Sequence, residues 1–423
     1  MTATQSSGYL QAKPTVQGTT VSFPVFYMRG GTSTGIVMWE QHFCGLSDFK
    51  EEIIRKIMGV PDAGERKGNK QITGLGRGVT TSNKVFIVEP HTQEPGVFKT
   101  TLAQLAAEKA AIDWSVNCGN MSAAIPLYLM TNGLVKLTKG ITQVSLFNTN
   151  TQVTTDCRVP TPTGRLEDIS LTEIPGVMGA FPGVELSLRN PIGAKTGRLL
   201  PTGSAKDVID GVEVSCVDVA VPMVILKAEQ LGLVGDESID SLNANKALIE
   251  RLRGIWVQAG LKMGLKTKSG TAMTAEQLAA SETIPKVCFV SKPSQGGHIR
   301  VRYFTPQQAH NSLAVTGGCC LAAACLTPGT TAHDIAQGLV PLSTTSDEER
   351  MVAMENPAGI LRARVYGRLK SGPGGGVQAA AELALPWAAY ERSAQIFMQG
   401  YAQIYNASKG LIQAVQTQSK QKA

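Results

Sequence analysis

Cys118 stands in a setting where a thiol could do chemistry. It lies in "DWSVNCGNMSAA" (113–124), between two asparagines and directly before a run of small residues that predicts a helix. The first turn of a helix offers unpaired N–H groups and a positive dipole end, which stabilise a thiolate and let it act as a base. The same N–H groups could hold the enolate formed when a proton leaves a carbon beside a carboxylate. A buried, inert thiol is the other interpretation, and these residues alone do not separate the two.

Lys84 and Ser33 are two further polar residues at the edges of glycine-rich loops. Lys84 closes "TTSNK" and begins the predicted strand 84–90. It could serve as a second acid/base group or bind a carboxylate, whereas a solvated strand end is the structural alternative. Ser33, in "GGTSTG", could donate its hydroxyl group to a carboxylate or simply cap a turn.

The glycine loops do not match nucleotide-binding motifs. "GGTSTG" (30–35) has phosphate-loop spacing, but Ile36 stands where that motif requires lysine. "GLGRGV" (74–79) lacks the last glycine spacing of a dinucleotide fingerprint, and the segment after it reads as a strand. We therefore favour loops that bring backbone N–H groups close to a carboxylate, because glycine has no Cβ to keep a ligand away.

Strands and helices must position these loops. The patterns predict strands over 21–28, 35–39, 84–90, 286–291 and 298–304, and helices over 48–58 and 243–263. "NCGN" (117–120) and "VTGG" (315–318) form two similar elbows, each before an alanine-rich run, which indicates a weak internal repeat with one copy per domain. We also expect a flexible loop over 371–376, with a helical region after it.

The expected domains follow from the turn-rich stretch near 201–210. Residues 21–205 form an N-terminal domain with Lys84 and Cys118, and residues 206–415 form a C-terminal domain with the second elbow. Residues 1–20 and 416–423 are polar and are expected to be disordered tails.

Composition bounds the class of protein. The 423 residues carry a net charge of +7 without blocks of like charge, which disfavours nucleic acid and would suit a small anionic substrate. The eight cysteines are scattered without C-x-x-C, and the five histidines show no metal-ligand spacing, so no metal site is predicted. No signal peptide or membrane span is evident in the sequence, and we expect a soluble cytoplasmic protein without a membrane partner.

Five motifs together resemble one family. They are "YMRGGTSTG" (27–35), "KQITGLGRGVTTSNK" (70–84), "IDWSVNCGN" (112–120), "LLPTG" (199–203) and "RYFTPQQAHNSLAVTGGCC" (302–320). In this order, over nearly the whole chain, they resemble the 2-methylaconitate isomerase family, whose relatives include aconitate Δ-isomerase, methylitaconate isomerase and oxalomesaconate tautomerase.

The resemblance implies an α+β fold like that of diaminopimelate epimerase. In that fold two pseudo-symmetric domains each wrap a curved mixed or antiparallel sheet around a central helix, with the site in the cleft between them. It also implies that the enzyme needs no cofactor. The family's catalytic lysine and cysteine fall on Lys84 and Cys118. We assign substrate binding to Ser33, Thr32, Asn83, Gly119, Asn120, Met121, His310, Thr316, Gly317, Gly318 and Cys319.

The sequence departs from related patterns at three positions. Epimerases of this fold carry a cysteine in each elbow, whereas the second elbow here offers Thr316, which argues against racemisation by two thiols. Thr73 stands where many relatives have aspartate, and Thr34 where many have lysine. These changes bear on the identity of the substrate more than on the type of reaction.

The expected activity is a shift of a C=C bond by 1,3-proton transfer in an unsaturated tricarboxylate, foremost the interconversion of cis- and trans-aconitate. The same chemistry on 2-methylaconitate, in propionate breakdown, is the nearest alternative. A tautomerase of oxalomesaconate type and a non-catalytic partner of a dehydratase are further alternatives. Homodimer formation is left open.

Overall fold

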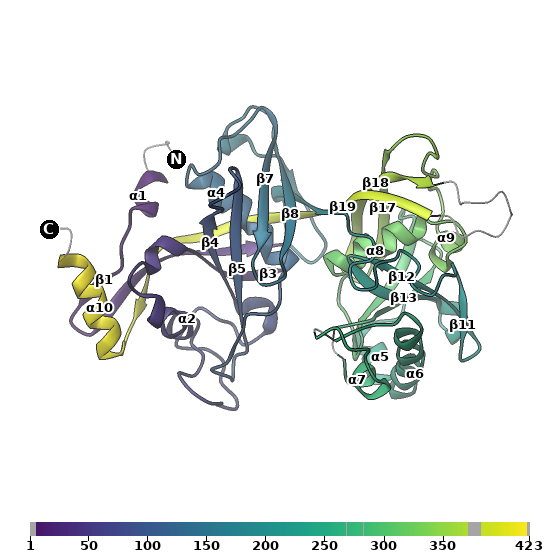
Figure 1. Ribbon diagram of the computed structural model, residues 1–423, viewed down its shortest axis with the longest axis horizontal. Helices are drawn as coiled ribbons and strands as arrows, with labels where there is room; N and C mark the ends of the chain where they lie inside the picture. The colour runs from purple at the N-terminus through teal and green to yellow at the C-terminus, as the bar shows by residue number, and fades with distance from the viewer. Residues whose placement is uncertain (1–5, 268, 282, 371–381, 421–423) are drawn as a thin grey trace. The chain divides into compact units, whose positions relative to one another are not determined.

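The computed structural model describes residues 6–267, 269–281, 283–370 and 382–420. The fold is mixed α+β and forms two compact units (Figure 1). The N-terminal unit comprises Met1–Leu186 and Arg392–Ala423, and the C-terminal unit comprises Ser187–Glu391.

In the N-terminal unit a mixed sheet surrounds a short, apolar pair of helices. Its strands are β1 (Thr15–Gln17), β2 (Thr20–Gly30), β3 (Ser33–Trp39), β4 (Lys84–Pro90), β5 (Val97–Leu105), β6 (Ile112–Asp113), β7 (Gly140–Asn148), β8 (Val153–Thr161) and β9 (Leu171–Thr172), with parts of β10 (Phe181–Arg189) and β19 (Glu382–Ile404). Its helices are α1 (Ser6–Leu10), α2 (Lys50–Met58), α3 (Gly119–Ser122), α4 (Ala124–Thr131) and α10 (Lys409–Lys420).

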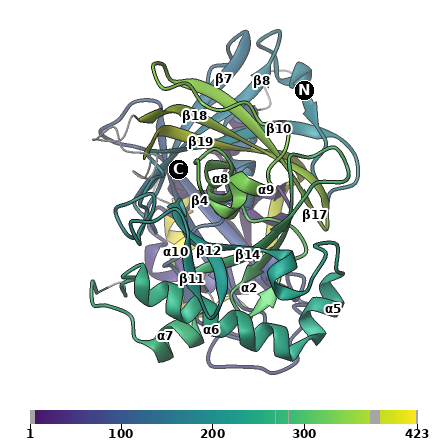
Figure 2. The ribbon, with the colours of Figure 1, turned by 90° about the vertical axis from the view of Figure 1, so that its right-hand side faces the viewer.

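The C-terminal unit has its own sheet, which encloses one long buried helix. Its strands are β11 (Asp207–Ile209), β12 (Val212–Val219), β13 (Val221–Lys227), β14 (Lys286–Ser291), β15 (Ile299–Thr305), β16 (Gln308–Ala309), β17 (Glu348–Asn356) and β18 (Gly359–Lys370), with the rest of β10 and β19. Its helices are α5 (Ile239–Ala244), α6 (Lys246–Lys262), α7 (Ala275–Ala280), α8 (Val315–Cys325) and α9 (Thr331–Ile335). Figure 2 shows α8 among the strands of this unit, with α5, α6 and α7 outside them.

The two sheets repeat one topology. In the N-terminal unit β2 and β3 pair antiparallel, β3 and β4 parallel, β4 and β5 antiparallel, β5 and β7 parallel, and β7 and β8 antiparallel. In the C-terminal unit the series β12, β13, β14, β15, β17 and β18 pairs in the same alternation. A two-residue strand precedes the elbow in both units, β6 against β5 and β16 against β15. The expected internal repeat and fold class are therefore confirmed.

Each sheet buries both faces, because helices cover one face while the central helix fills the other. In the N-terminal unit Val85 packs in the core that contains α2, and the next residue, Phe86, packs with α4. In the C-terminal unit Val287 packs in the core that contains α6, and Cys288 packs with α8. Successive side chains on a strand point to opposite faces, so this alternation fixes the face of every other residue on β4 and β14.

The central helices are apolar all round, as a helix enclosed by a sheet must be. Every residue of α4 from Ala124 to Met130 is buried, as is every residue of α8 from Gly317 to Cys325. The long helix predicted over 243–263 is α6, with Asn245 as its N-cap and Met263 as its C-cap.

The compact units divide the chain at other positions than the domain boundary expected after residue 205. The first division falls between Leu186 and Ser187, and the second between Glu391 and Arg392, which returns the end of the chain to the N-terminal unit. The reason for the second division is β19, a strand that lies where a helical region was expected after the predicted loop 371–376. Its first half pairs with β18 and its second half pairs with β2, and the period-2 burial pattern that would reveal a strand is interrupted along it.

The segments predicted to be disordered tails are ordered in part, which corrects that expectation. Tyr9 of α1 is buried and packs edge-on against Phe26 and Tyr128. At the other end, α10 extends over residues 416–420, and its Leu411 and Val415 are buried in the core that contains α2. The ring of Tyr9 in the first segment, and two apolar residues of α10 just before residue 416, hold these polar segments against the core. The predicted loop 371–376 lies outside the described residues.

No helix in the described part of the chain is long and apolar enough to cross a membrane. Across those same residues, no group of three or more histidine, cysteine or acidic side chains is arranged to hold a metal ion. All eight cysteines are described, and none of them forms a disulfide.

Candidate active site

Cys118 is the N-cap residue of α3, and its thiol points into the first turn of the helix. The backbone N–H of Met121 donates to Cys118 Sγ at 3.4 Å, and the hydroxyl oxygen of Ser33 lies 3.8 Å from the same sulfur. The thiol is partly exposed, in contrast to six of the other seven cysteines, which are buried. Burial raises the pKa of Cys157 and Cys288 in the cores well above the usual thiol value. Of these thiols, Cys118 is the one with both access to solvent and a polar hydroxyl beside it.

A double glycine lets the β2–β3 turn approach the Cys118 elbow. A Cβ at Gly30 would lie 2.5 Å from the backbone oxygen of Asn120, and a Cβ at Gly31 would lie 2.5 Å from its side-chain oxygen. Gly31 also has a φ of +53°, which side chains rarely adopt. Asn120 donates to Thr32 Oγ1 at 3.3 Å, so the glycines hold the Thr32–Ser33 turn against the elbow.

Two buried arginines support this turn, and the sequence analysis missed both as functional residues. Arg392 donates from Nε to Asn120 Oδ1 at 2.7 Å. Arg29 donates from Nη1 to the backbone oxygens of Gly31 and Ser393 at 2.9 and 3.2 Å, and its guanidinium lies over the ring of Phe181. Arg29 stands inside the motif "YMRGGTSTG" and could have been singled out. Arg392 is brought back by β19, 272 residues after Asn120.

Lys84 is buried at the first position of β4, and an amide rather than a carboxylate accepts its hydrogen bond. Lys84 Nζ donates to Gln104 Oε1 across the β4–β5 pair. The orientation of that amide follows from its other end, because Gln104 Nε2 donates to the backbone oxygens of Asn83 and Leu105 at 3.0 and 3.1 Å. Among the described residues no carboxylate forms an ion pair with Lys84. Gln104 is a second residue that sequence reasoning missed, since only strand register places it opposite Lys84.

Ser33, Lys84 and Cys118 lie on the same side of the sheet. Lys84 precedes Phe86 by two residues and so faces the central helix, and it pairs with Gly35, two residues after Ser33 on β3. Gly35 keeps the strands in close contact, because a Cβ there would lie 2.2 Å from the backbone oxygen of Lys84. The structure thus places the three residues that the sequence singled out for chemistry on one side of the sheet, with Ser33 and Cys118 in contact.

The other two residues predicted at this elbow, Gly119 and Met121, hold it in place. Gly119 is the first residue of α3, and Met121 contributes its N–H to Cys118 while its side chain is fully buried. Asn83 is also buried, with its side-chain oxygen beside Gly76 and without a hydrogen-bond partner among the described residues.

The second elbow differs from the first at its N-cap. Helix α8 begins at Val315, so its N-cap is Ala314, which has no side chain to cap the helix. Thr316, which the sequence comparison of the two elbows set against Cys118, is therefore inside α8 rather than at its N-cap.

The glycines of the second elbow make room for aromatic rings. A Cβ at Gly317 would lie 2.6 Å from the ring of Tyr303, and one at Gly318 would lie 2.5 Å from the ring of Tyr390. Cys319 is fully buried in the core around α8. His310 accepts from the Ser312 N–H at 2.9 Å, and its ring meets that of Tyr303 edge-on.

The N-terminal cluster combines groups suited to moving a proton next to an anion. It offers a thiol and an amine as acid/base groups, a hydroxyl as a hydrogen-bond donor, and the N–H groups of a helix start. Neither the thiol nor the amine is paired with a carboxylate of the described chain, so a negatively charged ligand meets no fixed negative charge on them.

Comparison with known proteins agrees with this arrangement. The family model described as PrpF protein matches residues 20–404. The chain is 33% identical to 4-oxalomesaconate tautomerase of Pseudomonas putida, over 79% of this chain and 87% of that protein. It is 25% identical to 2-methyl-aconitate isomerase of Shewanella oneidensis, over 89% of this chain and 96% of that protein. The crystal structure of a methylitaconate-delta-isomerase superposes with a TM-score of 0.74 at 27% identity, and the match covers 93% of this chain and 98% of that one.

Proposed function

This chain belongs to the PrpF protein family, and from that premise we propose that it is a cofactor-independent isomerase that moves a C=C bond in an unsaturated tricarboxylate. The observation that carries the proposal is the cluster of Ser33, Lys84 and Cys118 on one side of the sheet, with the thiol at a helix start. Relatives whose names describe isomerases and tautomerases of such acids support it.

The proposed reaction is a 1,3-proton shift. One member of the Lys84 and Cys118 pair takes a proton from the allylic CH₂ next to a carboxylate, and the resulting charge spreads over a dienolate. Backbone N–H groups at the start of α3 stabilise that charge, as does the hydroxyl group of Ser33. The other member of the pair returns a proton two carbons away, so the double bond moves by one position and no atom is gained or lost.

The proposed substrate is aconitate, whose cis and trans isomers this shift interconverts. A second candidate is 2-methylaconitate, favoured by the likeness to the Shewanella oneidensis protein over 96% of that protein's length. The Pseudomonas putida tautomerase, at higher identity, adds oxalomesaconate as a third.

Proton NMR in D₂O tests the proposal directly. Cis-aconitate, trans-aconitate, 2-methylaconitate and oxalomesaconate are offered separately, and the signals of isomerised product and incorporated deuterium are followed. We expect one of them to give deuterated product with the protein as purified and to give none with Cys118→Ser. A protein that binds one of these acids without any isotope exchange would instead be the non-catalytic binding partner.

A further inference from the structure

Gln104 lies opposite Lys84 on the neighbouring strand, and the two side chains meet. The register of β4 and β5 pairs these residues, and Lys84 Nζ donates a hydrogen bond to Gln104 Oε1. Lys84 is 6% exposed, so its amine has little contact with water and depends on acceptors of the protein. Among the described residues, Gln104 Oε1 is the acceptor that this amine has.

The other end of the Gln104 side chain fixes the orientation of its amide. Gln104 Nε2 donates to the backbone oxygens of Asn83, Leu105 and Thr80 at 3.0, 3.1 and 3.3 Å. A reversed amide would turn its oxygen toward these three carbonyl oxygens and its NH₂ group toward the amine of Lys84. Because the first of these contacts is repulsive, the oxygen of Gln104 stays on the Lys84 side.

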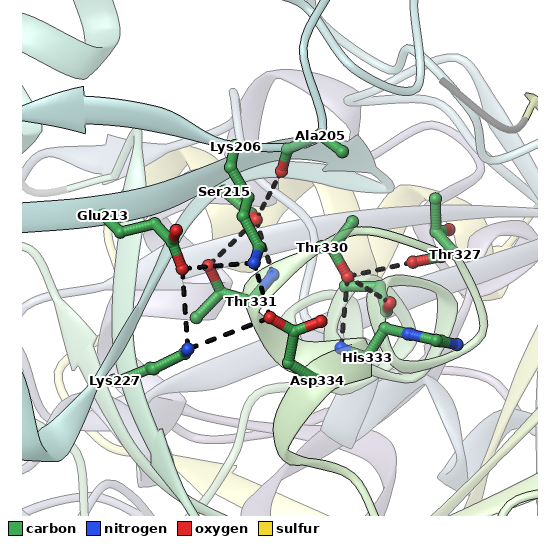
Figure 3. Close-up of polar contacts among 11 residues, drawn as sticks. Ala205, Lys206, Glu213, Ser215, Lys227, Thr327, Thr330, Thr331, His333 and Asp334 are labelled. Atoms are coloured by element: carbon green, nitrogen blue, oxygen red, sulfur yellow. Dashed lines mark hydrogen bonds and ion pairs between the residues drawn. The ribbon is translucent and has the colours of Figure 1, made fainter. Parts of the chain in front are cut away.

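Other lysines of the chain show what a charged partner does to an amine. In the C-terminal unit Lys206 and Lys227 both pair with Glu213 and Asp334, at distances from 2.5 to 3.8 Å (Figure 3). The hydrogen bond to Asp334 raises the pKa of Lys206, because a carboxylate stabilises the ammonium form. An amide oxygen accepts the same hydrogen bond without a net charge, so it orients an amine and holds its proton less firmly.

The equivalent position in the C-terminal unit carries no amide. Lys286 begins β14 as Lys84 begins β4, and it lies opposite Met223 of β13. The register of β14 and β15 places Thr305 on its other side, where Gln104 stands beside Lys84. The pairing of the lysine with a glutamine is therefore a feature of the unit that carries the Cys118 elbow.

The charges around Lys84 leave the amide as its direct neighbour. The strands β3, β5 and β6 and the α3 elbow place two titratable side chains on its side of the sheet, Cys118 and Asp113. Asp113 lies opposite Gln104, and its Oδ1 accepts from the N–H and hydroxyl groups of Ser115 at 2.7 and 2.6 Å. Among the described residues, no acidic side chain forms an ion pair with Lys84.

We propose that Gln104 is a positioning residue for proton transfer: its uncharged oxygen holds the Lys84 amine in place and leaves the amine free to take and return a proton. The amine keeps an N–H group for this hydrogen bond in both protonation states, so its position does not depend on the proton that moves. Gln104 itself neither gains nor loses a proton. The inference rests on the proposed function, because it requires that Lys84 transfers a proton to or from the substrate.

The test compares Gln104→Glu and Gln104→Met, with Gln143→Glu as a matched control. Both changes at residue 104 remove the donor to the three carbonyl groups, but only Gln104→Glu sets a negative charge beside Lys84. Gln143 is exposed on β7 of the same sheet, so its substitution adds the same charge away from the amine. For each protein, kcat and KM are measured over the pH range in which its melting temperature shows that it stays folded.

We expect Gln104→Met to lower kcat about 10- to 100-fold with KM little changed, since the amine loses its acceptor and its fixed position. Gln104→Glu should move one limb of the kcat profile to higher pH by about one unit or more, because a carboxylate stabilises the ammonium form. A shift of the acid limb means that Lys84 takes the proton, and a shift of the alkaline limb means that it returns one. Gln143→Glu should match the wild type.

Failure of the inference and failure of the proposed function give different results. If the wild type isomerises its substrate while Gln104→Met keeps its kcat, or while Gln104→Glu keeps the wild-type pH profile, the positioning role is wrong and the isomerase stands. A rise in KM at unchanged kcat also overturns the positioning role, because Gln104 would then contact the substrate. A wild type that isomerises none of the four acids overturns the isomerase, and with it the proton transfer that Gln104 would position.

Discussion

The two units of this protein share a strand order but not a chemistry. In the N-terminal unit the three equivalent positions around the elbow hold Ser33, Lys84 and Cys118. In the C-terminal unit strand register places Val221 and Lys286 at the first two positions, and the N-cap of the elbow helix is Ala314. Only the lysine is common to both. Shared topology thus fixes where a side chain stands, while the residue type decides whether that position can do chemistry.

The space beside the lysines differs as well. Gly35 leaves the backbone of Lys84 in close contact with β3, whereas its counterpart Met223 is fully buried in the core around α8. The glycines of the second elbow admit the rings of Tyr303 and Tyr390. The N-terminal unit therefore uses glycine to bring polar groups together, and the C-terminal unit uses it to pack aromatic rings.

Loss of the Cys118 thiol should have the largest effect on activity, because this thiol distinguishes the first elbow from the second. We expect Cys118→Ser to lower kcat/KM by about 10⁴-fold, because a serine hydroxyl at this position is a far weaker base than a thiolate. Deuterium incorporation followed by proton NMR measures it. Cys44→Ser, at an exposed thiol away from the elbow, is the control and should leave the rate unchanged. Full activity in Cys118→Ser would remove the chemical distinction between the two elbows.

Substitution of the two lysines should separate their roles. We expect Lys84→Met to lower kcat by about 10³-fold with a small change in KM, since an acid/base group acts in the transition state. Lys286→Met should change kcat far less, because Lys286 stands in the unit whose elbow helix has no thiol at its N-cap. Steady-state kinetics of both variants, measured side by side, make the comparison. Equal effects of the two substitutions on kcat would mean that both lysines handle protons.

Acid should weaken the N-terminal unit through His42, in the short helix η1 (Glu40–Phe43). Burial lowers its pKa to about 4, and its Nδ1 has no partner among the described residues. The folded state favours the neutral form of His42, so the stability that this residue contributes is complete above pH 6.5. It is lost as the pH falls from 6.5 toward 4, and the loss is on the order of 3 kcal/mol.

Urea unfolding at pH 7 and pH 4.5, for the wild type and for His42→Gln, measures this loss. The wild type should lose more stability than the variant on acidification. An identical pH dependence in both proteins would show that His42 is not responsible.

A smaller effect is expected from Gly35→Ala. The added methyl group would meet the Lys84 backbone oxygen at 2.2 Å, which forces β3 and β4 apart and costs about 2 kcal/mol. Gly254→Ala in α6 is the matched control, because open space surrounds that glycine and alanine favours the helix. Urea unfolding of both variants gives the two values. A stable Gly35→Ala variant would show that close strand contact at Lys84 is dispensable.

Much of the fold could be predicted from local patterns. The strands that begin at Lys84 and Lys286, the helix after Asn245 and the two elbows have clear periodicity, turn residues or caps in the sequence. The strand β19 was missed because its burial changes along its length as it pairs with β18 and then β2. The partial order of the tails was missed because it depends on a few anchors, such as Tyr9 within the first segment and Leu411 shortly before the second.

The sequence by itself determined which residues can do chemistry here, since a thiol before a helix and a lysine after a polar loop carry their reactivity in their own side chains and immediate neighbours. Only the tertiary structure decided which groups stand next to them. Strand register set Gln104 opposite Lys84, and the return of β19 brought Arg392 to Asn120. These contacts join residues far apart in the chain, and no local pattern encodes such pairings.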